Sequence, residues 1–155
     1  MPFFNPPWTE LSSTQTVDPQ THIDYWPPSA IMATAATPKD ENAPMEFFVE
    51  PPNDSTRYYI YLHFAELQKL EANESRAFDI TVNGKLLYGP VIPPYLSSTT
   101  IYSNAPITGA LNYSFVITKL ENSTLPPIIN AVEIYTFLDF AQSETLQDDG
   151  MLRRI

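Results

Sequence analysis

Hydrophobic positions recur along this chain with the period of two that is typical of β-strands. The clearest run spans residues 58–66, where one face is apolar and the other carries two tyrosines and a histidine. The first face comprises Tyr58, Ile60, Leu62 and Phe64, and the second comprises Tyr59, Tyr61 and His63. Because both faces are bulky, we expect a strand that is buried on one face and at least half covered on the other.

Further strands are expected on both sides of this one. Together the expected strands span residues 45–50, 57–66, 76–82, 85–88, 98–102, 111–120 and 128–137. The Asn83-Gly84 pair predicts a tight hairpin turn, because both residues tolerate positive φ. Pro90 is expected to end the strand at 85–88. Residues 67–75 are too short and polar for a helix, and residues 29–37 have the ambiguous propensity of a short strand.

Proline pairs divide the chain into strand-sized pieces. Proline cannot donate a hydrogen bond to a sheet, so each pair should lie between strands. The pairs begin at Pro6, Pro27, Pro51, Pro93 and Pro126. About seven to nine strands without a convincing helix predict an all-β fold, a β-sandwich of two antiparallel sheets.

The pattern also suggests three parts. Residues 1–26 lack periodicity and are expected to form an extended leader laid along the domain. Residues 27–140 hold the predicted sandwich. Residues 141–155 are polar and then end in Met151, Leu152 and Ile155, so we expect the start of a following module that is cut off.

Composition narrows the classes of function. The chain has 155 residues, which suits one domain, and a formal net charge of −10. No basic run exceeds the Arg153-Arg154 pair, so a nucleic-acid partner is not expected. No apolar run approaches the roughly 18 residues of a membrane helix, and no signal-peptide core is present. We therefore expect neither an export signal nor direct membrane insertion within this chain.

Asparagine sequons indicate the secretory pathway. The chain has no cysteine, but Asn-X-Ser/Thr occurs four times, where chance gives roughly one or two. The predicted glycosylation sites are Asn53, Asn73, Asn112 and Asn122. The alternative is that these sequons are accidental in a cytosolic protein.

No catalytic constellation emerges from the sequence. His22 and His63 are the only histidines, and we expect His63 to be a structural hydrogen-bonding residue. Asp79 and Glu133 lie on the wetter faces of their strands, but nothing in the sequence brings them together. We expect no enzyme, no cofactor and no metal site.

Aromatic residues provide the candidate binding site. Tyrosine at the edge of a sandwich can stack on sugar rings and hydrogen-bond their hydroxyls. Among the tyrosines outside the predicted dry faces, the candidates are Tyr59, Tyr61, Tyr95 and Tyr102. We take these four as candidate ligand-binding residues, with burial in a core or a seam between sheets as the alternative.

Three separated blocks resemble one known family. They are YYIYLHFAELQKL with NESRAFDITVNG, residues 123–149 beginning STLPPIINAVEIYTF, and the upstream PPSAIMATAATP of residues 27–38. They are similar to the malectin-like domain of plant leucine-rich-repeat receptor kinases, and the chain resembles the second of that family's two lobes. The resemblance implies a malectin-type jelly-roll β-sandwich on the extracellular side of the plasma membrane.

Two functions remain open on this resemblance. The first is a non-catalytic recognition module that binds an oligosaccharide, a cell-wall fragment or a peptide. The second is a truncated receptor fragment that only pairs with another receptor, the first lobe or a second copy. A glycosidase is a distant third reading, because it needs two carboxylates about 5–9.5 Å apart in a cleft.

Overall fold

A computed structural model of the chain describes residues 8–19 and 27–137. Several sequence-based predictions lie outside these residues. They are the junction segment 141–155, the pair beginning at Pro6, His22, residues 1–7 and 20–26 of the expected leader, and residues 138–140.

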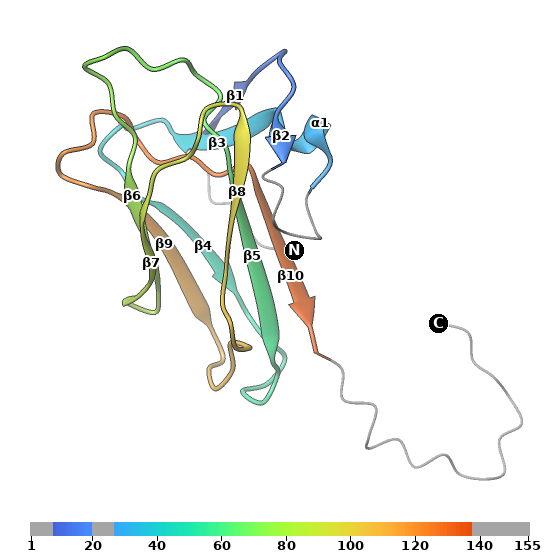
Figure 1. Cartoon of the computed structure of the whole chain (residues 1–155). Coiled ribbons are helices and arrows are strands. Elements are labelled where there is room, and N and C mark those ends of the chain that lie inside the picture. The colour runs from blue at the N-terminus through green and yellow to red at the C-terminus, as the bar shows by residue number, and fades with distance from the viewer. Residues whose placement is uncertain (1–7, 20–26, 138–155) are drawn as a thin grey trace, which may run out of the picture.

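Within the described residues, the chain forms ten strands and one short helix (Figure 1). In chain order they are β1 (Trp8–Ser12), β2 (Asp18–Pro19), α1 (Ser29–Met32), β3 (Thr34–Pro38), β4 (Met45–Val49), β5 (Tyr58–Phe64), β6 (Phe78–Val82), β7 (Lys85–Val91), β8 (Ser97–Tyr102), β9 (Tyr113–Lys119) and β10 (Ala131–Thr136).

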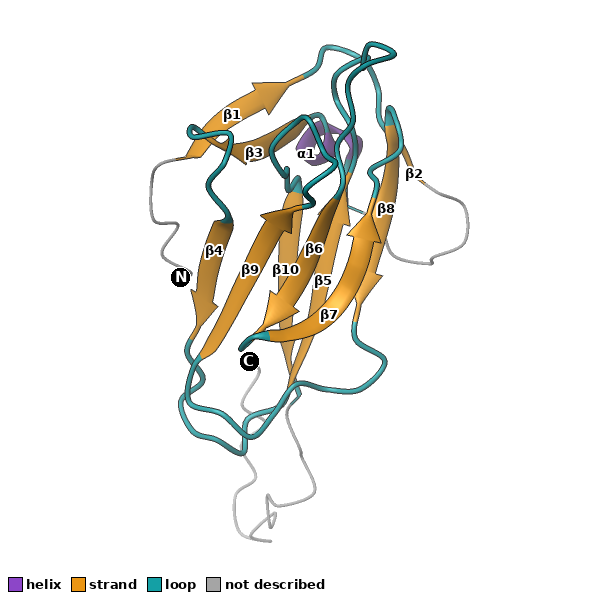
Figure 2. Cartoon of the chain, turned by 90° about the vertical axis from the view of Figure 1, so that its left-hand side faces the viewer, coloured by secondary structure: helices purple, strands orange, loops and turns teal. Residues whose placement is uncertain are grey.

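Two four-stranded sheets form the sandwich. One has the order β10-β5-β8-β2 and the other β4-β9-β6-β7, and Figure 2 shows the second sheet lying in front of the first. Apart from the short parallel pair of β2 with β8, the strands in both sheets pair antiparallel. The predicted all-β sandwich is confirmed. A third sheet, in which β1 pairs with β3, lies across one end of it.

The chain passes repeatedly from one sheet to the other. After β4 it crosses to β5, returns to β6 and β7, crosses to β8, returns to β9 and ends in β10. Apart from the β6–β7 hairpin, sequential strands from β4 to β10 therefore lie in opposite sheets, as expected for a jelly roll. One consequence is that strands far apart in sequence, β5 and β10, become neighbours.

The core lies between the inner faces of the two sheets. Phe64 of β5 packs against Phe78 of β6 with their ring centroids 5.3 Å apart, and Tyr58 meets Tyr113 edge-on at 6.4 Å. These contacts join the two sheets near both ends of β5. Fully buried side chains on the two inner faces include Phe47, Phe64, Phe78, Phe115, Ile60, Leu62, Ile80 and Ile117. The dry face predicted for residues 58–64 is confirmed.

The predicted hairpin turn is confirmed, but the strand after it is longer than expected. Asn83 and Gly84 have φ of 47° and 78° and connect β6 directly to β7. β7 continues through Pro90 because it is an edge strand and because its register with β6 shifts at this point, between the pairs Phe78–Val91 and Ile80–Tyr88. Gly89 permits a close approach of β6, since a Cβ there would lie 1.9 Å from Oδ1 of Asp79.

The structure differs in detail from three further expectations. Residues 29–32 form α1 and only residues 34–38 form a strand. The strand expected at 111–120 begins later, since β9 starts at Tyr113 and Leu111 before it is 67% exposed. The residues expected to be an aperiodic leader include β1, which pairs with β3 through their backbones, so its side chains need not alternate.

A buried ion pair fixes the long connection between β5 and β6. Arg76 contacts the carboxylate of Glu66 at 2.6 Å, and both side chains are buried. The same guanidinium donates to Gln68 at 2.8 Å and to the carbonyl oxygen of Pro126. The connection is thereby attached to the segment between β9 and β10.

Candidate ligand-binding surface

Four tyrosines gather on the outer face of the β10-β5-β8 sheet. Tyr59 and Tyr61 alternate outward from β5, and the strand register places Tyr135 of β10 opposite Tyr59 and Tyr102 of β8 opposite Tyr61. The Tyr61 ring stacks on Tyr102 with centroids 5.7 Å apart and planes 27° apart. Tyr135 meets Tyr61 edge-on at 5.7 Å. We call these four residues the tyrosine surface.

The outer tyrosines of this surface remain accessible. Tyr102 is 48% exposed and Tyr135 is 44% exposed, whereas Tyr59 and Tyr61 are half-buried between their neighbours. The stacked and edge-on contacts hold the central ring in a defined orientation. The surface therefore offers aromatic rings and hydroxyl groups on a rigid sheet.

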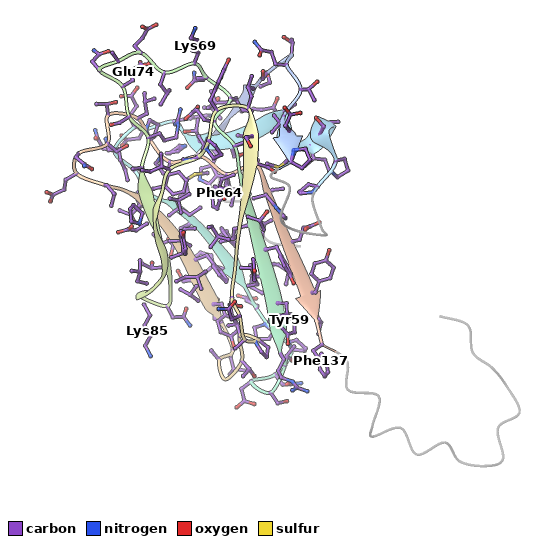
Figure 3. All side chains as sticks on the ribbon, in the orientation of Figure 1. Tyr59, Phe64, Lys69, Glu74, Lys85 and Phe137 are labelled. Atoms are coloured by element: carbon purple, nitrogen blue, oxygen red, sulfur yellow. The ribbon has the colours of Figure 1, made fainter. Side chains whose placement is uncertain are left out.

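Phe137 extends this aromatic face beyond the end of β10. The guanidinium of Arg57 lies over the Phe137 ring, 4.4 Å from its centroid. The Phe137 N–H also donates to the Arg57 carbonyl at 2.9 Å. Figure 3 shows Tyr59 and Phe137 close together at this end of the sandwich.

A hydrogen-bonded histidine lies beside the tyrosine surface. His63 is fully buried, with Nδ1 2.8 Å from the Thr100 hydroxyl and Nε2 2.9 Å from Oε2 of Glu133. Because a carboxylate only accepts, Nε2 carries the proton donated to Glu133, and Nδ1 can accept from Thr100. The predicted structural role of His63 is confirmed. Glu133, whose side chain is 25% exposed, links this buried site to solvent.

Replacing Glu133 tests that link. Glu133→Ala should lower the free energy of unfolding by about 1–3 kcal/mol, because it leaves a buried ring nitrogen of His63 unpaired. Glu133→Gln retains an acceptor of nearly the same shape, so its free energy of unfolding should fall clearly less. Urea unfolding of both variants measures the difference, and equal losses would contradict a hydrogen-bonding role.

Tyr95 does not join the other candidates. It pairs with Glu66, which lies beyond the end of β5 and five residues after Tyr61, a distance of about 16 Å in an extended chain. Tyr135 takes its place in the cluster. The sequence alone could have indicated Tyr135, because Tyr135 and Glu133 lie on the same face of the strand predicted at 128–137. Only the register between β5 and β10 shows that this face of β10 lies beside Tyr59 and Tyr61.

The carboxylates considered for glycoside hydrolysis lie far apart. Asp79 points outward from β6 in one sheet, and Glu133 points outward from β10 in the other. Packed sheets are about 10 Å apart, so the whole sandwich separates these two outer faces. Among the described residues, no group of three or more His, Cys, Asp and Glu side chains could hold a metal ion.

Two shallow grooves lie elsewhere on the described surface. One, of about 350 Å³, runs between the β1–β3 sheet and the start of β10, beside Trp8, Ala36 and Asn130. The other, of similar volume, separates the β6–β7 hairpin from residues 107–113. Neither groove includes a residue of the tyrosine surface.

All four sequon asparagines are exposed. Asn53 lies between β4 and β5, Asn73 between β5 and β6, Asn112 directly before β9, and Asn122 between β9 and β10. None lies within a strand. No helix in the described part of the chain is long and apolar enough to cross a membrane.

Comparison with known proteins finds one domain family and a group of plant relatives. The sequence profile of the malectin-like domain family matches residues 1–137. Receptor-like protein kinase At5g59670 of Arabidopsis thaliana is 41% identical over 153 residues, covering 96% of this chain and 17% of the relative. LRR receptor-like serine/threonine-protein kinase IOS1 of the same plant is 35% identical over 140 residues, covering 89% and 15%. The chain spans about a sixth of the length of these curated relatives.

Solved structures show the same fold at low sequence identity. The ANX2 ectodomain from Arabidopsis thaliana superposes with a TM-score of 0.63 at 18% identity, covering 85% of this chain and 40% of that one. A structure of the plant peptide RALF23 in complex with FER and LLG2 gives a TM-score of 0.59 at 15% identity, covering 82% and 38%. The profile match and the relatives above 30% identity together show that this chain belongs to the malectin-like domain family.

Proposed function

We propose that this chain is a non-catalytic recognition module, the second malectin-like lobe of a receptor-kinase ectodomain on the extracellular side of the plasma membrane. The relatives with which it aligns are receptor-like kinases about six times its length. This function requires a binding surface and no catalytic group. The observation that carries the proposal is the tyrosine surface.

The chemistry of this surface favours a carbohydrate ligand. Sugar rings present C–H faces that pack on aromatic rings and hydroxyls that need hydrogen-bond partners. The exposed rings of Tyr102 and Tyr135 supply the first, and the tyrosine hydroxyls with the partly exposed Glu133 supply the second. We therefore propose cell-wall oligosaccharides as the ligand class.

An oligosaccharide array tests this proposal. The secreted chain is applied to glucose disaccharides and cell-wall oligomers, beside a Tyr61→Ala variant with an unchanged circular dichroism spectrum. We expect a reproducible signal for the natural sequence that is lost in the variant. Silence from a folded sample, or a signal that Tyr61→Ala leaves unchanged, would contradict sugar binding at this surface.

Peptide or partner-receptor binding is the second candidate. Two observations favour it: a structural neighbour contains FER with the peptide RALF23 and LLG2, and apolar side chains are exposed on the opposite sheet. There Phe48 is 39% exposed and Leu86 is 63% exposed. A silent array combined with self-association in sedimentation that Leu86→Ser abolishes would favour this candidate.

A further inference from the structure

Two of the four sequons meet at one end of the sandwich. Asn73-Glu74-Ser75 lies in the connection between β5 and β6, and Asn122-Ser123-Thr124 lies in the connection between β9 and β10. Figure 3 shows Glu74 on the loop at this end of the molecule, opposite the end that carries Lys85. Both asparagines are exposed.

Each sequon hydroxyl is bound by the other sequon. The Thr124 hydroxyl accepts from the Ser75 N–H at 2.8 Å and donates to the Ser75 carbonyl at 3.2 Å. The Ser75 hydroxyl donates to the carbonyl of Asn122 at 3.2 Å. The Thr124 N–H also donates to the Ser75 carbonyl at 3.0 Å. The two tripeptides thus form one docked unit.

The middle residue of the second sequon strengthens this docking. Ser123 is buried, and its hydroxyl accepts from the Ala77 N–H at 3.0 Å. The same hydroxyl lies 3.0 Å from the carbonyl oxygens of both Ser75 and Leu125, to either of which it can donate its one proton. The buried Arg76 next to Ser75 also reaches the Pro126 carbonyl. Both loops would have to separate before either tripeptide could take another conformation.

The sequon at Asn53 is arranged differently. Its Ser55 hydroxyl contacts Oδ1 of Asn53 itself at 2.6 Å, and both residues are exposed. The Thr56 hydroxyl contacts the same oxygen at 3.1 Å. Because these bonds stay within neighbouring residues, Asn53 and its hydroxyl remain together and accessible in the folded chain.

We propose that Asn73 and Asn122 carry a pair of N-linked glycans that must be attached before their two loops dock. A transferase has to hold the asparagine and the hydroxyl of one sequon in the same active site. In the transfer, Nδ2 of asparagine forms a bond to C1 of a lipid-linked oligosaccharide pyrophosphate. The C1–O bond breaks, the lipid pyrophosphate leaves, and Nδ2 loses one proton. The inference rests on the proposed extracellular function, because this donor belongs to the secretory pathway.

Two preparations of the chain test the proposal. The first is made in plant cells behind a supplied signal peptide. The second is made without glycans in the bacterial cytosol, folded, and then incubated with membranes that contain the transferase and its lipid-linked donor. Peptides covering residues 70–78 and 119–127 are incubated in parallel. Deglycosylation in heavy-oxygen water marks each occupied asparagine for mass spectrometry.

We expect glycans on both Asn73 and Asn122 in the plant-made chain. In the folded bacterial chain we expect transfer to Asn53 but not to Asn73 or Asn122, whereas both peptides accept. An unoccupied Asn73 or Asn122 in plant cells would overturn the proposal. Equal transfer to the folded chain and to the peptides would overturn the required order.

Matched variants distinguish the effect of the glycan from the effect of the hydrogen bonds between the two loops. Asn122→Gln should remove one glycan and keep the docked loops, while Thr124→Ala should remove the same glycan and the bonds to Ser75. Thr124→Ser should retain both. Glycan occupancy is read independently of ligand binding, so a silent oligosaccharide array would count against the proposed function without changing this result.

Discussion

Phe115→Ala is expected to lower the free energy of unfolding by about 3–5 kcal/mol. Phe115 is fully buried on β9, and its ring stacks on that of Phe47 with centroids 4.9 Å apart and planes 5° apart. The two residues are direct cross-strand partners between β4 and β9. Alanine removes this contact and leaves a cavity between the sheets that the neighbouring strands can fill only partly.

Phe48→Ala is the matched control for this substitution. Phe48 follows Phe47 on β4, but its side chain points to the outer face and is 39% exposed. Its replacement should cost less than about 1 kcal/mol, because it opens no cavity. Urea unfolding of both variants gives the comparison. A cost below about 1 kcal/mol for Phe115→Ala would mean that the assignment of the inner face is wrong.

Arg76→Met should be similarly destabilising and lower the free energy of unfolding by about 3–5 kcal/mol. The substitution keeps an unbranched side chain but leaves the carboxylate of Glu66 buried without its cationic partner. It also removes the donors to Gln68 and to the Pro126 carbonyl. The connections at residues 65–77 and 120–130 would therefore lose their shared anchor.

The double variant Arg76→Met with Glu66→Leu shows whether buried charge is the cause. Removing both charges removes the uncompensated carboxylate, so the double variant should regain much of the stability that Arg76→Met loses. Thermal unfolding followed by circular dichroism measures all three proteins. If the double variant is less stable than Arg76→Met, the stability lost in Arg76→Met comes from packing and not from an unpaired buried charge.

Local alternation was enough to predict most of the sandwich. The inner faces of β5, β6 and β9 follow directly from their period-two patterns, and the Asn83-Gly84 turn follows from its tolerance of positive φ. These features depend on residues close together in sequence.

Features that depend on tertiary neighbours were missed. Pro90 stays within β7 because that strand lies at an edge of its sheet and its pairing with β6 is irregular there, which no local pattern reveals. β1 gains its strand geometry from backbone pairing with β3 and not from its own periodicity. Buried Arg76 is polar in sequence and gives no signal that Glu66 will neutralise it.

The candidate site was predicted in the same partial way. Tyr59 and Tyr61 lie on the outer face of β5, as their alternation predicted. Tyr102, another candidate, lies beside Tyr61. Tyr135 belongs to the cluster and Tyr95 does not, because the register between strands distant in sequence decides which tyrosines are neighbours.

The most direct test of the central claim is a calorimetric titration with the strongest oligosaccharide from the array. Tyr102→Ala is the informative variant, since this ring is 48% exposed and lies at the margin of the cluster. Tyr88→Ala is its control, because Tyr88 is 49% exposed on β7 of the opposite sheet. Loss of one stacked ring should raise the Kd about tenfold for Tyr102→Ala and leave it unchanged for Tyr88→Ala. Equal Kd values for both variants and the natural sequence would contradict recognition through the tyrosine surface.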